Sequence, residues 1–404
     1  MISHNGGFYK VGDEIFVSKI EAIYKANQTK KDISWNFHND VFNSIDWTTE
    51  PEETLDSFYK TRALQIRNKY DYLVLFCSGG ADSTNMLYSF LKNGIHVDEV
   101  VAGAPISGLN RWQDNLSDKS AENTISETRL TQLPLMKEIS EKWPAVKITI
   151  HDYFIDMLNF KEDEWLWKSD DYIHPTFAAR YKLDRDEYNH LKKIADSGKS
   201  IGFVYGLDKP FIIEDNGMYF SVIRDQIVCN AFNALEHPMS YVEMFYYTPN
   251  LPLMMVKQAH CVAKFISMPH NFYIYDNILF DSKRVIGGDP TKTGDLRDYS
   301  KTAHSGIYER GIVPLIYPSL EKQVFQANKP RSVFFGEHDS WFEKLHQDTR
   351  AFQLVKSDFN NFISSVDSKF FRTNNDVITQ FISLSRKYSI GSVLNFAPRN
   401  IITK

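Results

Sequence analysis

A run of six residues, Ser78-Gly79-Gly80-Ala81-Asp82-Ser83, has the composition of an anion-binding loop. Two adjacent glycines let the backbone approach an anion closely and adopt dihedral angles that other residues avoid. The serine hydroxyls add hydrogen-bond donors. Backbone amides and hydroxyls in this arrangement are suited to binding a phosphate or pyrophosphate group.

The residues on either side predict that this loop joins a strand to a helix. The apolar run 72–77 indicates a buried strand, and apolar residues recur at helical spacing from Met86 to Leu91. Asn93-Gly94 is expected to end the helix. The loop should therefore lie at the positive end of a helix dipole, with Asp82 and Ser83 facing solvent in the first turn.

A glycine turn without a ligand is the simpler alternative for this run. A Walker A phosphate loop is excluded, because no lysine follows the glycines in the pattern Gly-x-x-x-x-Gly-Lys-Ser/Thr. The strand before the run and the helix after it favour anion binding over an ordinary turn.

Composition bounds the class of protein. A chain of 404 residues has room for two or three structural units, and a formal net charge of -5 gives no bulk attraction to nucleic acid or membrane. The three cysteines, Cys77, Cys229 and Cys261, are widely separated, which argues against a zinc site, an iron-sulfur cluster or a disulfide framework. No signal sequence or membrane-spanning apolar run is found, so we expect a cytoplasmic protein without membrane contact.

The order of the predicted elements indicates an α/β fold with a doubly wound parallel sheet. Residues 1–60 predict a small N-terminal appendage with a hairpin at 7–17, and residues 226–404 predict a mainly helical C-terminal region that includes a helix at 252–265. The α/β domain spans 61–225. Its predicted strands are 72–77, 97–102, 146–150 and 200–205, with helices at 54–70, 81–92, 130–139 and 187–196 between or before them.

Ligands of such sheets bind beyond the carboxyl ends of the strands. The loops expected to converge there are 78–83, 103–105, 151–152 and 205–209.

The loop and its context resemble the PP-loop ATP pyrophosphatases, whose signature is Ser-Gly-Gly-x-Asp-Ser after the first strand of an HUP-like domain. That superfamily includes asparagine synthetase, GMP synthetase, NAD synthetase, deazaguanine synthase and PAPS reductase. The resemblance covers about residues 70–225. The layout of the whole chain is closest in style to asparagine synthetase-like proteins of bacteriophages, which implies a cytoplasmic site of action in an infected bacterium.

The resemblance implies that ATP is cleaved between its α and β phosphates and that a substrate oxygen is adenylated. A nucleophile, often ammonia or an amine, then displaces AMP. Ser78, Gly79, Gly80, Ala81, Asp82 and Ser83 would hold the pyrophosphate, with Asp82 also a Mg²⁺ ligand and, like Ser83, part of the catalytic machinery. The backbone at Ala102 and Gly103 would contact adenine.

Other residues are weaker candidates. By the same resemblance Asp208 could bind Mg²⁺ or a substrate amine, and Lys209 could neutralise the α-phosphate, although a solvated turn is the alternative. Lys257 and His260 could reach phosphates from a helix, or could be a surface lysine and a packed histidine. A polar cluster at His338 and Asp339 suits substrate binding and a structural loop equally.

Two departures from the asparagine synthetase pattern affect the reaction. Position 2 is Ile2 where a glutaminase domain has its nucleophilic cysteine, and the N-terminal stretch is too short for such a domain. We therefore expect free ammonia, an amine or a partner protein such as a glutaminase to supply the nitrogen. Thiolation is disfavoured because paired cysteines are missing, and Cys77 is expected in the core.

Three rival functions remain open beside the AMP-forming ligase. A PAPS reductase-like enzyme normally needs a cysteine in its C-terminal tail, and residues 400–404 contain none. Modification of a nucleic acid base, as by the deazaguanine branch, would need a basic channel that the net charge does not indicate. A module that binds ATP or AMP without catalysis would serve a partner protein.

Overall fold

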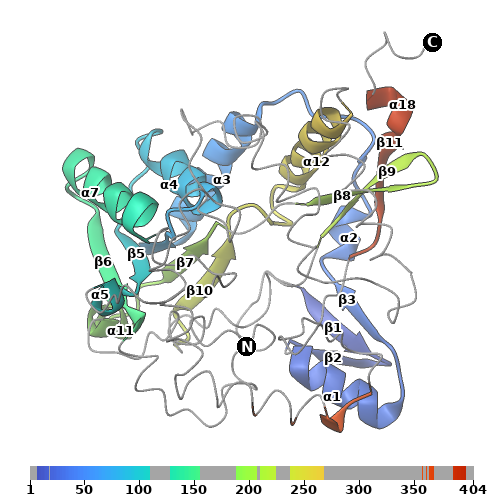
Figure 1. The fold of residues 1–404 in the computed structure, drawn as a ribbon, viewed down its shortest axis with the longest axis horizontal. Coiled ribbons are helices and arrows are strands. Elements are labelled where there is room, and N and C mark those ends of the chain that lie inside the picture. The colour runs from blue at the N-terminus through green and yellow to red at the C-terminus, as the bar shows by residue number, and fades with distance from the viewer. Residues whose placement is uncertain are drawn as a thin grey trace, which may run out of the picture.

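The structure is a computed structural model of the 404-residue chain. It describes residues 7–17, 19–109, 128–154, 188–206, 210–223, 237–267 and 385–396, together with 357, 361 and 364–367. These residues form one five-stranded sheet and two three-stranded sheets, with helices packed around them (Figure 1).

The five-stranded sheet is parallel throughout and has the strand order β10-β7-β4-β5-β6. Counted along the chain, its strands lie in the order 5-4-1-2-3, so the direction of winding reverses between β4 and β7. This is the switch point of a doubly wound sheet. The predicted α/β class is confirmed. The strands are β4 (Tyr72–Phe76), β5 (Glu99–Ala104), β6 (Lys147–Asp152), β7 (Ile201–Tyr205) and β10 (Ser240–Met244).

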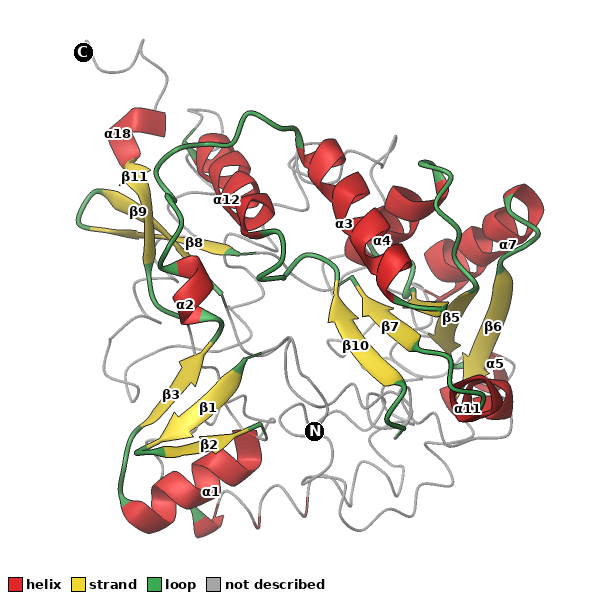
Figure 2. Ribbon diagram, turned by 180° about the vertical axis from the view of Figure 1, so that it is seen from behind, coloured by secondary structure: helices red, strands yellow, loops and turns green. Residues whose placement is uncertain are grey.

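Helices cover both faces of this sheet. Figure 2 shows α3 (Leu55–Lys69), α4 (Ala81–Leu91) and α7 (Leu133–Lys142) along one face and α11 (Asn189–Asp196) on the other. Helix α3 begins after Thr54, whose hydroxyl accepts a hydrogen bond from Ser57 N, as an N-cap residue does. All four helices lie where the sequence predicts them. Short helix α5 (Ile106–Leu109) follows β5.

The N-terminal residues form an antiparallel sheet in the order β2-β1-β3. Strands β1 (Phe8–Val11) and β2 (Glu14–Phe16) are the predicted hairpin. The sequence did not predict β3 (Ile33–Asn36), which follows helix α1 (Lys19–Thr29) and precedes α2 (Asn39–Phe42).

A third sheet, of order β11-β9-β8, joins distant parts of the chain. Strands β8 (Phe211–Asp215) and β9 (Met218–Val222) form a hairpin whose turn, Asn216-Gly217, has positive φ angles of 52° and 74°. Strand β11 (Tyr388–Ser392) pairs with β9. Helices α12 (Pro252–Ile266) and α18 (Val393–Phe396) accompany this sheet. Helix α12 was predicted from the sequence. Strands β10 and β11 were not, because residues 226–404 were predicted to be mainly helical.

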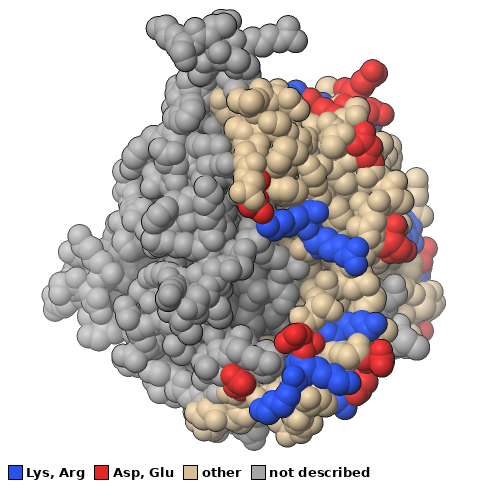
Figure 3. Space-filling view, turned by 90° about the vertical axis from the view of Figure 1, so that its right-hand side faces the viewer, with Lys and Arg blue, Asp and Glu red and all other residues tan. Residues whose placement is uncertain are grey.

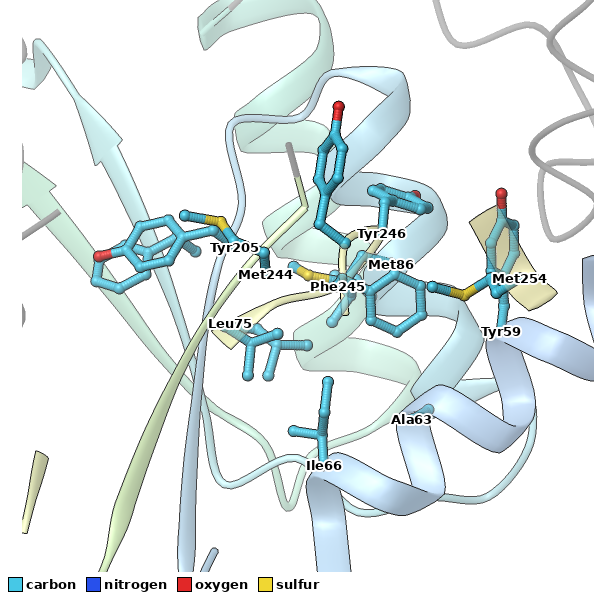
Figure 4. Close-up of a cluster of buried hydrophobic side chains, with 14 of the residues drawn as sticks. Tyr59, Ala63, Ile66, Leu75, Met86, Tyr205, Met244, Phe245, Tyr246 and Met254 are labelled. Atoms are coloured by element: carbon cyan, nitrogen blue, oxygen red, sulfur yellow. The ribbon is translucent and has the colours of Figure 1, made fainter. Parts of the chain in front are cut away.

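One cluster of buried side chains runs through all of these parts. Figure 4 shows residues of α3, α4, β4 and the segment after β10 gathered together, with Met254 of α12 beside Tyr59. In the same cluster the ring of Trp47 stacks on Tyr388 with 4.6 Å between the ring centroids. The N-terminal residues therefore pack directly against the last described strand.

A buried ion pair fastens α3 to β10, the edge strand of the sheet. Arg62 Nη2 lies 2.7 Å from Glu243 Oε2, and Lys69 Nζ lies 2.6 Å from Glu243 Oε1. Burial opposes ionisation of Glu243, but the charge of Arg62 and the hydrogen bonds from Lys69 and Tyr70 outweigh it and lower the pKa from 4.5 to about 2. Glu243 is therefore charged in the folded protein at neutral pH.

None of the helices in the described ranges is long and apolar enough to cross a membrane. On the face shown in Figure 3, lysine and arginine side chains lie beside aspartate and glutamate side chains across the described residues.

Candidate functional site

The Ser-Gly-Gly-Ala-Asp-Ser loop leaves the carboxyl end of β4 and runs directly into α4. Strand β4 is central in the sheet and pairs with β7 at the switch point. The loop therefore lies where doubly wound sheets bind their ligands. The helix that follows starts at Ala81 with Gly80 as its N-cap residue, so the cap supplies no side-chain acceptor to the amides of the first turn. Those amides have no acceptor within the helix itself.

The hydroxyl of Ser83 organises the interior of this loop. It lies 3.2 Å from Ser78 N and 3.2 Å from Ser78 Oγ, and it donates to Gly80 O at 3.2 Å. Gly80 N in turn donates to Ser78 Oγ at 3.3 Å. Ser83 is buried, whereas Ser78 is exposed and Asp82 is half-buried. The prediction that Ser83 faces solvent is wrong, because its hydroxyl turns inward to satisfy the loop backbone.

Gly79 is glycine for two physical reasons. Its φ of +82° is rare for any residue with a side chain. A Cβ atom at this position would also lie 2.8 Å from the backbone nitrogen and 2.8 Å from the Cα of Gln132. Gln132 is the last residue of a single π-turn, η1 (Thr128–Gln132), which leads into α7. The loop and this turn are thus in direct backbone contact.

Two other strand ends hold the first turn of α4. Tyr246, just beyond β10, donates its hydroxyl to Asp82 O at 2.8 Å and accepts from Asn85 Nδ2 at 2.8 Å. Gly206, just beyond β7, lies so close that a Cβ atom there would be 3.0 Å from Asp82 O and 3.1 Å from Ser83 Cα. The ends of the fourth and fifth strands therefore position the residues that carry the predicted chemistry.

The end of β5 is the second predicted contact for a nucleotide. Ala102 and Gly103 lie inside the strand, which continues to Ala104, and they pair with Ile150 and His151 of β6. Gly103 is half-buried, while Ala102 is buried. Gly103 O accepts a hydrogen bond from the side chain of Gln132, which also donates to Cys77 O before the loop.

The structure gives Lys257 and His260 partners in the segment before α3. Lys257 Nζ lies 2.9 Å from Glu50 Oε1 and 2.9 Å from Pro51 O. His260 Nε2 lies 2.9 Å from Trp47 O, and burial lowers its pKa. Both residues therefore join α12 to residues 47–51. This is a structural role, the alternative to phosphate binding that the sequence analysis kept for them.

The remaining predicted site residues, Asp208, Lys209, His338 and Asp339, lie outside the described residues. Among the described residues, no group of three or more histidine, cysteine, aspartate or glutamate side chains is placed to hold a metal ion. Asp82 is the carboxylate that the described loop offers. Of the described cysteines, Cys77 is buried in the core, and burial raises the pKa of the Cys261 thiol to about 11.

A second concentration of titratable groups surrounds the buried carboxylate of Glu99. It lies 2.7 Å from His190 Nε2, 3.4 Å from Lys147 Nζ and 3.0 Å from the hydroxyl of Tyr72. Tyr72, Glu99 and Lys147 are the first residues of β4, β5 and β6. This cluster therefore lies at the amino ends of the strands, opposite to the edge where ligands bind, and it ties α11 to the sheet.

Sequence reasoning missed Tyr246, Asn85 and Gln132. A polar aromatic residue directly after a strand would have been a signal for Tyr246 if β10 had been recognised. No local pattern marks Gln132, because its contacts depend on a π-turn and on strands far away in the chain.

The chain matches no protein-family model, and comparison with curated proteins and with solved structures likewise gives no match.

Proposed function

We propose that this chain is an ATP-dependent, AMP-forming ligase that adenylates a carboxylate or carbonyl oxygen and transfers the activated group to ammonia or an amine. The observation that carries the proposal is the Ser-Gly-Gly-Ala-Asp-Ser loop between β4 and α4, at the switch point of a doubly wound parallel sheet. Its resemblance to the PP-loop signature supplies the type of reaction.

In this proposal an oxygen of the substrate attacks the α-phosphorus of ATP. The bond between that phosphorus and the bridging oxygen breaks, and pyrophosphate leaves with the bonding electrons. The nitrogen nucleophile then attacks the activated carbon, loses a proton, and displaces AMP. The protein can accelerate this first step mainly by holding hydrogen-bond donors where negative charge develops on the leaving pyrophosphate.

The residues of the chain have distinct parts in this scheme. The hydroxyl of Ser78 and the first-turn amides of α4 would bind the pyrophosphate. Ser83, held inside the loop, keeps these donors in place. Mg²⁺ would bind phosphate oxygens and the half-buried carboxylate of Asp82, since it prefers oxygen ligands and commonly shares them with substrate phosphates, and it would neutralise charge on the leaving group.

Incubation with ATP labelled at the α-phosphate tests this proposal. Purified protein is supplied with Mg²⁺, a panel of carboxylates, and ammonium, glutamine or primary amines as nitrogen donors. We expect labelled AMP and equimolar pyrophosphate with at least one combination, and a reduction of both by on the order of 10² in Asp82→Asn. Labelled ADP would identify a different phosphoryl transfer. Binding of ATP without turnover across the panel would favour the non-catalytic nucleotide module.

A further inference from the structure

We propose that Gln132 is a positioning residue that fixes the separation between the phosphate-binding loop and the end of β5, and thereby favours ligands that span both. This inference rests on the proposed function, because it assumes that the loop binds the phosphates of a nucleotide. It adds a residue that the loop motif does not contain.

The side-chain amide of Gln132 cross-links two strands where their own pairing ends. The last described backbone hydrogen bond from β4 to β5 runs from Cys77 N to Val101 O at 2.9 Å. Beyond it, Gln132 Nε2 donates to Cys77 O at 3.1 Å and to Gly103 O at 3.1 Å. A primary amide nitrogen carries two hydrogens, so this one group can serve both carbonyls.

The backbone of the same residue supports the loop from its other side. Gln132 N and Cα would lie 2.8 Å from a Cβ atom at Gly79, which places the end of η1 against the glycines. Gln132 is only 2% exposed, so both its backbone and its side chain are enclosed by the groups that they contact. Single π-turns within helices often occur at functional sites.

At the end of β5, Gly103 is half-buried, whereas Ala102 and Ala104 are fully buried. The three residues there, Ala102, Gly103 and Ala104, carry nothing larger than a methyl group. A nucleotide whose phosphates occupy the loop can extend toward the half-buried Gly103, and its affinity then depends on the distance between these two contacts. Pyrophosphate occupies the loop alone and does not depend on that distance.

Binding measurements on Gln132→Leu separate these two cases. Leucine has a similar size but cannot donate a hydrogen bond. We expect the Kd of α,β-methylene-ATP to rise by at least about tenfold, while the Kd values of pyrophosphate and of AMP stay within about threefold, because only the linked ligand depends on the spacing. Isothermal titration calorimetry measures all three.

Gln258→Leu is the matched control. Gln258 is a fully buried glutamine of α12 whose amide donates to the hydroxyl of Tyr59 at 3.4 Å. This hydrogen bond does not involve the loop, so all three affinities should stay within about threefold of wild type, whatever the effect on stability. Gln132→Asn gives a second test if the leucine variant does not fold, because its shorter amide cannot reach both carbonyls and should show the same selective loss.

Equal weakening of pyrophosphate and the ATP analogue in the Gln132 variants, or no change in either, would overturn the inference and leave the proposed function standing. A wild-type protein that binds neither ligand would instead refute the proposed function.

Discussion

At the scale of single residues, Asp82 and Ser83 are adjacent in the loop but differ in burial and in their contacts. Asp82 is half-buried in the first turn of α4 and offers a carboxylate at the loop. Ser83 is buried, and its hydroxyl contacts Ser78 and Gly80 within the loop. Adjacent positions in one motif therefore combine a half-buried carboxylate with a hydroxyl that supports the loop from inside.

Substitution of these two residues should separate activity from stability. Asp82→Asn is expected to lower AMP formation by on the order of 10² while changing the free energy of unfolding by less than about 1 kcal/mol. Ser83→Ala should lower AMP formation and also cost about 1 kcal/mol, because buried hydrogen bonds are lost. Activity assays and urea unfolding measure the two effects. Near-wild-type turnover in both variants would contradict the assignment.

At the scale of elements, the first turn of α4 is held by the ends of β7 and β10 as well as by β4. Tyr246 reaches Asp82 O from beyond β10, and Gly206 packs against the same turn from beyond β7. The loop is thus supported by three neighbouring strands. The residues that provide this support lie outside the six-residue motif, so the motif alone does not predict them.

Tyr246→Phe removes the hydroxyl that links Asn85 to Asp82 O. We expect AMP formation to fall roughly tenfold, since small displacements of reacting groups are costly. Tyr59→Phe is the control, because Tyr59 is equally buried in the same cluster but its hydroxyl accepts from Gln258. Both variants should lose some stability. Equal turnover in the two would show that the Tyr246 hydroxyl does not position the loop.

The attachment of α3 to β10 should make stability depend on pH in the acid range. The pKa of Glu243 falls from 4.5 to about 2 on folding, so the unfolded chain binds more protons between these values. This contribution to stability is complete above pH 4.5 and is lost as the pH falls toward 2. Over this window it amounts to roughly 3 kcal/mol.

Glu243→Gln tests this dependence. The variant will be less stable at neutral pH because Arg62 loses its buried partner. Its free energy of unfolding should nevertheless fall less steeply than that of wild type as the pH is lowered from 5 to 3. Urea unfolding at several pH values gives both slopes, and parallel curves would mean that Glu243 is not the group responsible.

At the scale of the whole molecule, segments far apart in the chain share one core. Trp47 stacks on Tyr388, donates its ring N–H to Phe42 O at 2.9 Å, and lies beside His260 of α12. Trp47→Ala is therefore expected to cost about 3 to 5 kcal/mol, the usual range for removing a buried large aromatic side chain. Chemical unfolding measures it. A cost below about 1 kcal/mol would mean that this junction contributes little.

The sequence predicts the loop with its flanking strand and helix better than it predicts the full architecture. The loop, β4 and α4 follow from local patterns, because glycines, hydroxyls and apolar spacing act over a few residues. Strand β10 was missed because Glu243 lies within its short apolar run, and this carboxylate is buried through its contacts with Arg62, Lys69 and Tyr70. The Asn216-Gly217 turn was a usable hairpin signal that was overlooked. The long-range pairing of β11 with β9 has no local signature.

The central claim, that this loop binds the phosphates of ATP, is tested most directly by titrating pyrophosphate and α,β-methylene-ATP into wild type, Gly79→Ala and Gly198→Ala. Both glycines have a φ of +82°, so the backbone strain is matched, but only a Cβ at Gly79 meets neighbouring atoms, whereas at Gly198 nothing lies within 4 Å. We predict that wild type and Gly198→Ala bind both ligands and that Gly79→Ala binds them at least about tenfold more weakly, because the loop amides are displaced. Failure of the wild-type protein to bind either ligand, or undiminished binding by a folded Gly79→Ala variant, would contradict the account.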